Sequence, residues 1–86
     1  METLKVASRS DPSSVAGAIA GALERDGVVE IHAIGAGAVN QSVKAIAGVR
    51  RMVERECGPP IKVIPGFMEV VIAGKAKTGI RFIVER

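Results

Sequence analysis

Two closely spaced glycines, Gly35 and Gly37, are the residues of this chain with the clearest chemical potential. They stand in the run Ala-Ile-Gly-Ala-Gly-Ala-Val-Asn-Gln, where the alternating segment 28–34 predicts a strand and the apolar spacing after residue 38 predicts a helix. A glycine turn at a helix start leaves backbone N–H groups unblocked at the positive end of the helix dipole. The run therefore indicates either a site for an anion such as phosphate or tight packing of the strand against the helix.

Polar side chains on both sides of that turn suit the same anion chemistry. Segment 8–14 is a polar loop with one arginine, Arg9, and several hydroxyl donors, among them Ser10. Asn40 lies in the first turn of the predicted helix, where it either caps the helix or reaches a sugar or base edge. Lys44 lies on the exposed side of the same helix and would support an anion held at the glycines. These residues predict a surface that contacts phosphates.

A lysine-bearing turn near the C-terminus offers a second set of cations. Segment 74–79 has the composition of a hairpin turn, with Lys75 and Lys77 on either side of Ala76. These lysines either straddle phosphates or protect an exposed sheet edge, and the sequence leaves both roles open. Arg81 follows just inside the last strand. The predicted binding residues are Arg9, Ser10, Gly35, Gly37, Asn40, Lys44, Lys75, Lys77 and Arg81.

Other chemistries find little support in the sequence. A dinucleotide-binding turn would have its third glycine where this chain has Asn40, and no Gly-Lys-Ser/Thr motif is present. His32 is the only histidine, too few for a zinc site, which usually takes four ligands. The serines have no imidazole placed to act as their base. We therefore expect no enzymatic activity, no metal, no cofactor and no small-molecule substrate.

The composition fits one small domain spanning residues 1–86. Apolar residues make up 48% of the chain, which excludes disorder, but they are mostly Ala, Val and Ile, and only Phe67 and Phe82 are aromatic. We expect both phenylalanines to be buried. A core of such small side chains is thin, so we expect a homodimer that hides further surface. Twelve basic against nine acidic side chains give a net charge of +3, a mild bias towards polyanions.

Cysteine content and apolar run length bear on the cellular compartment. Cys57 is the only cysteine, so no internal disulfide can form. The longest apolar run, 15–23, has nine residues, whereas a membrane-spanning helix needs about 20. The N-terminus lacks the apolar segment of a secretory signal. We therefore expect a cytoplasmic protein that does not bind membranes.

Hydrophobic periodicity and turn residues predict six elements in the order β-α-β-α-β-β. Asp11 before Pro12 marks the start of the first helix, and Gly27 marks its end. The Pro65-Gly66 pair predicts either a bulge or an edge position in the third strand. The predicted ranges are strands 3–7, 28–34, 61–72 and 80–85, and helices 12–26 and 38–56.

Right-handed crossovers place both helices on one face of the sheet. The expected fold class is therefore α/β (α+β), a two-layer sandwich of one four-stranded sheet and two helices. The other face of the sheet stays partly uncovered and carries Lys5, Glu30 and His32.

Two further glycines, Gly17 and Gly21, fall inside the first predicted helix. Each costs about 1 kcal/mol of helix stability relative to alanine, so a compensating contact is expected. We expect close packing of this helix against the sheet or the second helix. Contact with another subunit is the alternative.

Two runs of the sequence resemble the stage V sporulation protein S family. They are Ser-Ser-Val-Ala-Gly-Ala-Ile-Ala-Gly at 13–21 and Glu-Ile-His-Ala-Ile-Gly-Ala-Gly-Ala-Val-Asn-Gln-Ser-Val-Lys-Ala at 30–45. The resemblance implies a small, cytoplasmic bacterial protein tied to sporulation, septation, spore coat assembly and developmental gene control. It also implies an Alba-like fold, with a mixed sheet whose last strand lies inside it, antiparallel to the others.

Alba-like proteins are typically dimers that bind DNA or RNA, and the resemblance implies corresponding positions here. Their loop after the first strand contacts the nucleic-acid backbone, and here it offers Arg9. Their turn into the second helix resembles residues 35–38. Their last hairpin is an arm that enters a minor groove; here it carries Lys75 and Lys77 and looks short. The resemblance thus implies a homodimeric regulator that contacts phosphates with low sequence specificity. A protein-interaction module using the open sheet face and the hairpin is the alternative.

Overall fold

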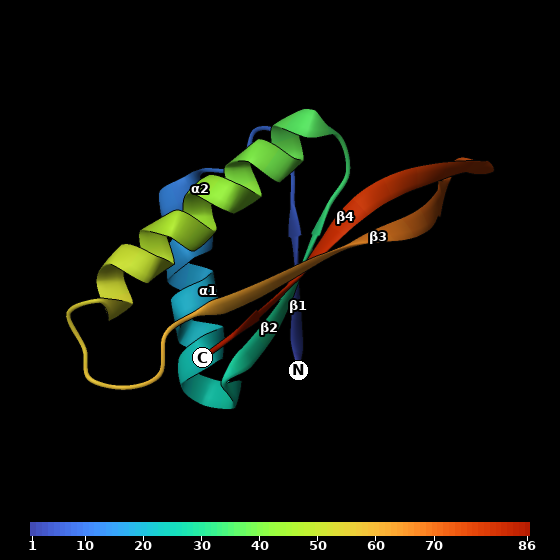
Figure 1. Ribbon diagram of the computed structural model, residues 1–86. Coiled ribbons are helices and arrows are strands. Elements are labelled where there is room, and N and C mark those ends of the chain that lie inside the picture. The colour runs from blue at the N-terminus through green and yellow to red at the C-terminus, as the bar shows by residue number, and fades with distance from the viewer.

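The computed structural model describes residues 1–86 and contains the six predicted elements in the predicted order (Figure 1). Each boundary lies within three residues of its prediction, except the start of the last strand. The elements are β1 (Glu2–Val6), α1 (Pro12–Asp26), β2 (Val28–Ala33), α2 (Ala36–Val53), β3 (Lys62–Ile72) and β4 (Lys75–Glu85). Both helices pack on one face of the sheet, so the two-layer fold is confirmed.

The four strands form one mixed sheet in the order β1-β2-β4-β3. β1 and β2 are parallel, whereas β4 is antiparallel to both β2 and β3. The last strand therefore lies inside the sheet, as the family resemblance implies. β3 lies at an edge, and its pairing with β4 is continuous through Pro65 and Gly66. Of the two predictions for this pair, the edge position is correct, because an edge tolerates a residue without an N–H group.

The helices begin and end close to the positions predicted from capping and helix-breaking residues. Asp11 precedes α1, but its side chain caps no backbone N–H and instead accepts a hydrogen bond from Ser14 Oγ at 3.0 Å. Gly27 ends α1 with a left-handed φ of 75°, and its N–H donates to the Leu23 carbonyl at 2.8 Å. α2 ends at Val53, three residues before the predicted end at residue 56. Neither helix is both long enough and apolar enough to cross a membrane.

The core is small and lies between the sheet and the two helices. Alternate residues of the central strands point into it, for example Val29, Ile31 and Val84, and they meet Ile19 and Val49 from the helices. Only 16 of the 86 residues are buried. The expectation of a thin core is therefore confirmed, and much apolar surface stays exposed on a single chain.

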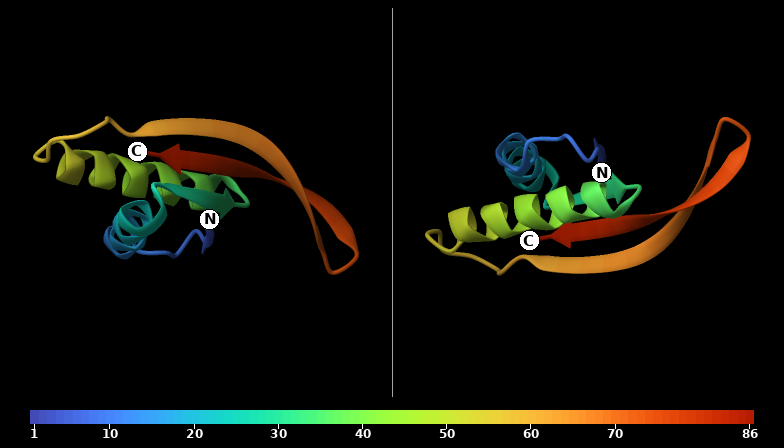
Figure 2. Two further views of the ribbon diagram at one scale, coloured as in Figure 1. Left: turned by 90° about the horizontal axis from the view of Figure 1, so that it is seen from below. Right: turned by 90° about the horizontal axis from the view of Figure 1, so that it is seen from above.

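The last hairpin is much longer than predicted. β2 pairs with β4 only as far as Ala33 opposite Ile80, so residues 68–79 project beyond the sheet as a two-stranded arm (Figure 2). This arm helps to stretch the molecule to 46 × 22 × 17 Å. The turn consists of Ala73 and Gly74, with φ values of 52° and 77°, as in a two-residue hairpin turn.

The predicted turn 74–79 is therefore wrong, and so is the prediction that the arm is short. Lys75 and Lys77 belong to β4 and pair with Ile72 and Val70. The segment has the glycines and lysines of a turn, but the β-branched residues opposite it supply a strand partner. Tertiary pairing thus overrides the local composition.

The two phenylalanines have opposite environments. Phe82 is buried in the core, as predicted, but Phe67 is 81% exposed. Phe67 lies on the edge strand opposite Ile80, at the root of the arm. The prediction that it is buried is wrong, because within one chain no element covers this end of β3.

Candidate nucleic-acid interface

Three segments that carry predicted binding residues lie at the same end of the sheet. The parallel strands β1 and β2 end side by side, with Val6 opposite Ala33. The loop after β1 and the turn after β2 therefore leave the sheet at this end (Figure 1). The arm leaves from the same end, since Ala33 also pairs with Ile80. The topology thus brings together groups that are far apart in the sequence.

The loop after β1 packs directly against the first turns of α2. A Cβ atom on Gly37 would lie 2.8 Å from the Ser8 Cβ, so only glycine allows this approach. Gln41 Nε2 also donates a hydrogen bond to the Ser8 carbonyl at 3.2 Å. Gly35 has a φ of 91°, a conformation that favours glycine. Gly37 therefore has a packing reason, one of the two roles that the sequence left open, whereas Gly35 is explained by its backbone conformation.

The same turn also keeps the features of an anion site. No side chain caps α2, so its first N–H groups lack the partner that a capping residue usually supplies. Gly35, Ala36 and Gly37 are exposed. Packing and anion binding are thus compatible here, because the turn is exposed and α2 has no side-chain cap.

The polar residues around this turn differ in whether their side chains already have a hydrogen-bond or ion-pair partner. Arg9 is exposed and makes no ion pair. Ser10 braces its own loop, because its Oγ accepts a hydrogen bond from the Ala7 N–H at 2.9 Å. Asn40 is exposed in the first turns of α2. Lys44 is also exposed but lies eight residues from the start of the helix, roughly 12 Å along its axis.

The cations of the arm also differ in their partners. Lys75 and Lys77 are exposed, unpaired and two residues apart in a strand, so they lie on the same face of the arm. Arg81 lies on the body of the sheet, where its Nε is 3.5 Å from Glu30 Oε1. Glu30 also contacts His32, with 2.9 Å between Oε2 and Nε2. Arg81 is therefore the predicted residue whose charge is most nearly balanced.

Unpaired charges are distributed unevenly over the two ends of the sheet. The five ion pairs of the chain leave Lys5, Arg9, Lys75 and Lys77 without a carboxylate at the loop and arm end. Asp11 and Glu69 are the carboxylates of these segments. At the other end, the unpaired carboxylates Glu24, Asp26 and Glu85 are matched in number by the unpaired cations Arg51, Arg55 and Lys62. The end that gathers the predicted residues is thus also the more positive one.

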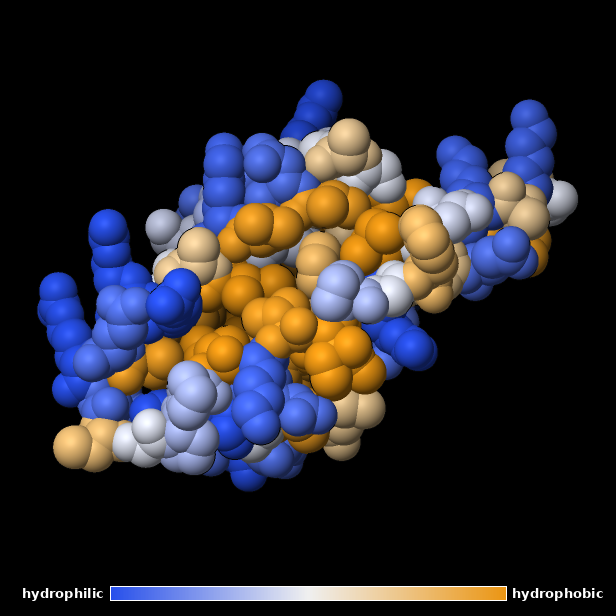
Figure 3. Space-filling view, viewed as in Figure 1, coloured by the Kyte–Doolittle hydropathy of each residue, from blue (hydrophilic) through white to orange (hydrophobic).

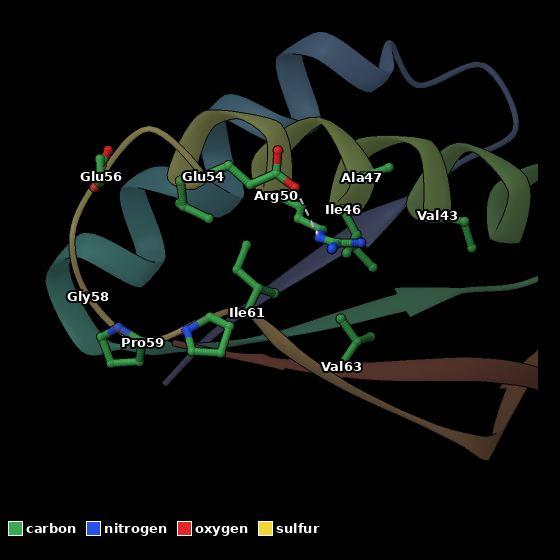
Figure 4. A pocket seen from close by; sticks show the side chains of 12 residues that line it. Val43, Ile46, Ala47, Arg50, Glu54, Glu56, Gly58, Pro59, Ile61 and Val63 are labelled. Atoms are coloured by element: carbon green, nitrogen blue, oxygen red, sulfur yellow. Dashed lines mark ion pairs between the residues drawn. The ribbon is translucent and has the colours of Figure 1, made fainter.

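A second surface, between α2 and β3, is apolar. Figure 3 shows it as a continuous hydrophobic band, and Figure 4 shows its side chains pointing toward one another across a cavity of about 620 Å³. Val43 and Ile46 of α2 face Ile61 and Val63 of the other wall. Its one ion pair joins Arg50 Nε and Glu54 Oε1 at 3.3 Å. The sequence did not indicate this groove, because it depends on the spacing between two elements.

Comparison with known protein families identifies the family of this chain. The family model described as stage V sporulation protein S matches residues 2–86, essentially the whole chain. The chain belongs to the stage V sporulation protein S family. Membership supports a role related to sporulation, in a regulatory family that is not a known enzyme family. The resemblance in runs 13–21 and 30–45 is thereby confirmed.

Proposed function

We propose that this family member is a non-enzymatic regulator that binds the phosphate backbone of DNA or RNA with low sequence specificity. One observation carries the proposal. The loop after β1, the turn after β2 and the arm meet at one end of the sheet, with Arg9, Lys75 and Lys77 free of carboxylate partners. Sporulation, septation and spore coat assembly are the processes in which we expect the regulator to act.

Phosphate contact explains the low sequence specificity in this proposal. Lysine, arginine and free backbone N–H groups suit phosphate oxygens, and such contacts fix position without reading bases. The chain has few groups placed to read base edges at this end, chiefly Asn40. Binding by phosphate contacts releases condensed counterions and therefore weakens steeply as salt rises.

We also propose that the regulator is a homodimer. Two large apolar side chains that line the groove between α2 and β3, Val43 and Val63, are 50% and 38% exposed, and Phe67, farther along β3, is 81% exposed. Isolated chains seldom leave such a contiguous apolar surface uncovered. A second copy would cover it and would double the number of phosphate-binding ends.

A salt titration of binding tests the proposed function. The probe is a fluorescently labelled duplex, and the readout is anisotropy from about 50 to 200 mM salt. Replacing Lys75 and Lys77 by alanine should weaken binding of all sequences about equally and lower the log–log salt slope by about 1 per lysine.

The matched control removes two positive charges elsewhere. Lys62 and Arg55 are exposed and unpaired, and they lie away from the loop and arm end. The variant with alanine at both should keep the salt slope of the unaltered protein. If the unaltered protein binds neither duplex DNA nor duplex RNA at tens of micromolar in low salt, the proposal is wrong.

A protein-interaction module is the second candidate. The sequence assigned it to the open sheet face and the hairpin, but the groove of about 620 Å³ between α2 and β3 is the surface that favours it. In this reading, the apolar groove binds a partner protein in development and the cations only keep the sheet edge soluble. Binding through the groove would depend little on salt. The salt titration therefore separates the two candidates.

A further inference from the structure

The open face of the sheet carries a hollow of about 750 Å³ at the root of the arm. The arm curves as it leaves the sheet (Figure 2), and its β3 strand lines the hollow together with the ends of β1 and β2. The volume falls within the range of small-ligand sites, roughly 300–1,000 Å³. Its lining residues include Lys5, His32, Ile34, Met68, Val70 and Ile72.

Strand register places cations and apolar side chains together on this face. Lys5 lies opposite His32, and His32 lies opposite Arg81, so a row of basic side chains crosses three strands. Lys77 and Lys75 lie opposite Val70 and Ile72 and share their face of the arm. The arm thus extends the basic row along the apolar side of the hollow.

The carboxylates near the hollow do not balance these cations. Glu30 lies beside this row, two residues before His32, and it already contacts both His32 at 2.9 Å and Arg81 at 3.5 Å. Lys5, Lys75 and Lys77 have no carboxylate within 4 Å. The hollow therefore combines an apolar floor with one unpaired lysine in its lining, Lys5, and two more, Lys75 and Lys77, on the adjoining strand of the arm.

This combination suits a ligand with flat, weakly polar groups attached to a repeating anion. A nucleic-acid duplex hides its bases, whereas an unpaired strand exposes both bases and phosphates. A second copy of the chain suits the face poorly, because pairing it with itself about a two-fold axis would bring lysines toward lysines. The unpaired charges therefore favour a polyanion over a further subunit.

We propose that this hollow receives unpaired nucleotides of single-stranded DNA or RNA, with a base against Met68 and Val70 and phosphates on Lys5, Lys75 and Lys77. The inference rests on the proposed function, because it assumes nucleic-acid binding, but it assigns the single strand to the open sheet face. The base packs on aliphatic and thioether groups, since neither phenylalanine lies on this face: Phe82 points into the core and Phe67 has the same orientation in β3.

Anisotropy with two labelled probes of equal length, a single strand and a hairpin duplex, tests the inference at low salt. Met68→Glu places a negative charge on the floor of the hollow, and we expect it to weaken single-strand binding about five- to tenfold. Duplex binding through the loops should change less than about twofold. Met68→Leu keeps the apolar floor and should retain single-strand binding, which separates lost chemistry from lost folding.

The matched control is Ile64→Glu. Ile64 lies four residues earlier on the same face of β3, is 56% exposed and does not line the hollow. We expect this variant to leave single-strand binding unchanged. As a second readout, the Met68 methyl resonance, one of three methionine methyls, should shift when the single strand is added and stay in place when the duplex is added.

The other possible results of these experiments would each contradict either the nucleotide site or the proposed function. Duplex binding without single-strand binding, or a Met68→Glu protein with unchanged single-strand affinity, overturns the hollow as a nucleotide site and leaves the proposed function intact. Binding of neither probe overturns both. A change of oligomeric state in Met68→Glu, measured by light scattering, shows that a second copy covers this face and overturns the inference.

Discussion

At the scale of single residues, helix glycines in this chain have two different explanations. Gly37 permits the contact between α2 and the loop after β1, since a Cβ there would lie 2.8 Å from the Ser8 Cβ. Gly17 has no heavy atom within 4 Å of an added Cβ, and Gly21 meets only the flexible side chain of Arg25. The expected close packing of Gly17 and Gly21 within the chain is therefore wrong. Contact with another subunit is the alternative that remains.

Alanine substitutions at Gly17 and Gly37 should have opposite effects. Gly17→Ala should raise the free energy of unfolding by about 1 kcal/mol, because it adds helix propensity without a clash. Gly37→Ala should lower it, because the loop after β1 must move. Urea unfolding followed by circular dichroism measures both. A Gly17→Ala protein that is less stable and less oligomeric would instead place Gly17 in a subunit contact.

At the scale of elements, the arm depends on a turn whose first residue is not ideal. Ala73 has a φ of 52°, a left-handed conformation that L-residues with a Cβ adopt at a cost of roughly 1–2 kcal/mol. Asparagine tolerates it better, and Asn-Gly is a preferred pair in such two-residue turns. Gly74 already supplies the second position.

The variant Ala73→Asn should therefore stabilise the arm by about 0.5–1 kcal/mol relative to its locally opened state. Amide hydrogen exchange measures this, and the amides of β3 and β4 nearest the turn should exchange about two- to fivefold more slowly. Ala73→Val serves as the opposing control, since β-branched residues adopt positive φ poorly. Faster exchange in Ala73→Asn would contradict the assigned turn geometry.

The arm also shows where prediction from the sequence reached its limit. Asp11-Pro12 marks the start of α1, and Gly27 and Gly35 mark the ends of α1 and β2. β1, α1 and β2 form within one residue of expectation. The residues 75–79 contain turn-forming types, and only their pairing with β3 reveals a strand. Pairing across the hairpin is a tertiary property, so local composition gave the wrong assignment there.

The candidate site could be selected from the sequence only in part. Residue type was enough to select Arg9, Gly35 and Lys75, because cations and glycine turns have a characteristic chemistry. The contribution of Lys5 and Met68 to a hollow depends on the curvature of the arm over the end of the sheet. Sequence periodicity carries no information on that curvature.

At the scale of the whole molecule, the chain has one basic end, one basic hollow and one apolar side. The groove between α2 and β3 adjoins the core at Ile46 and is lined by the exposed side chains of Val43 and Val63. Homodimerisation through this side would leave the basic end and the hollow accessible in both copies. Such a dimer would hold a polyanion at two places at once, which raises its apparent affinity.

Val43→Glu tests this arrangement directly. Val43 is 50% exposed on α2 and lines the groove, so a carboxylate there should leave the fold of the chain intact but bury an unpaired charge in the dimer. We expect the dimer dissociation constant to rise at least about tenfold, measured by sedimentation or light scattering across a concentration series. Nucleic-acid affinity should fall with it while the salt slope per chain stays the same. Ile64→Glu, on the open face of β3, adds the same charge at a side chain that is 56% exposed and lines neither the groove nor the hollow, and it should change neither quantity. A Val43→Glu protein that still forms dimers would place the subunit contact elsewhere, with the exposed glycines of α1 as the next surface to test.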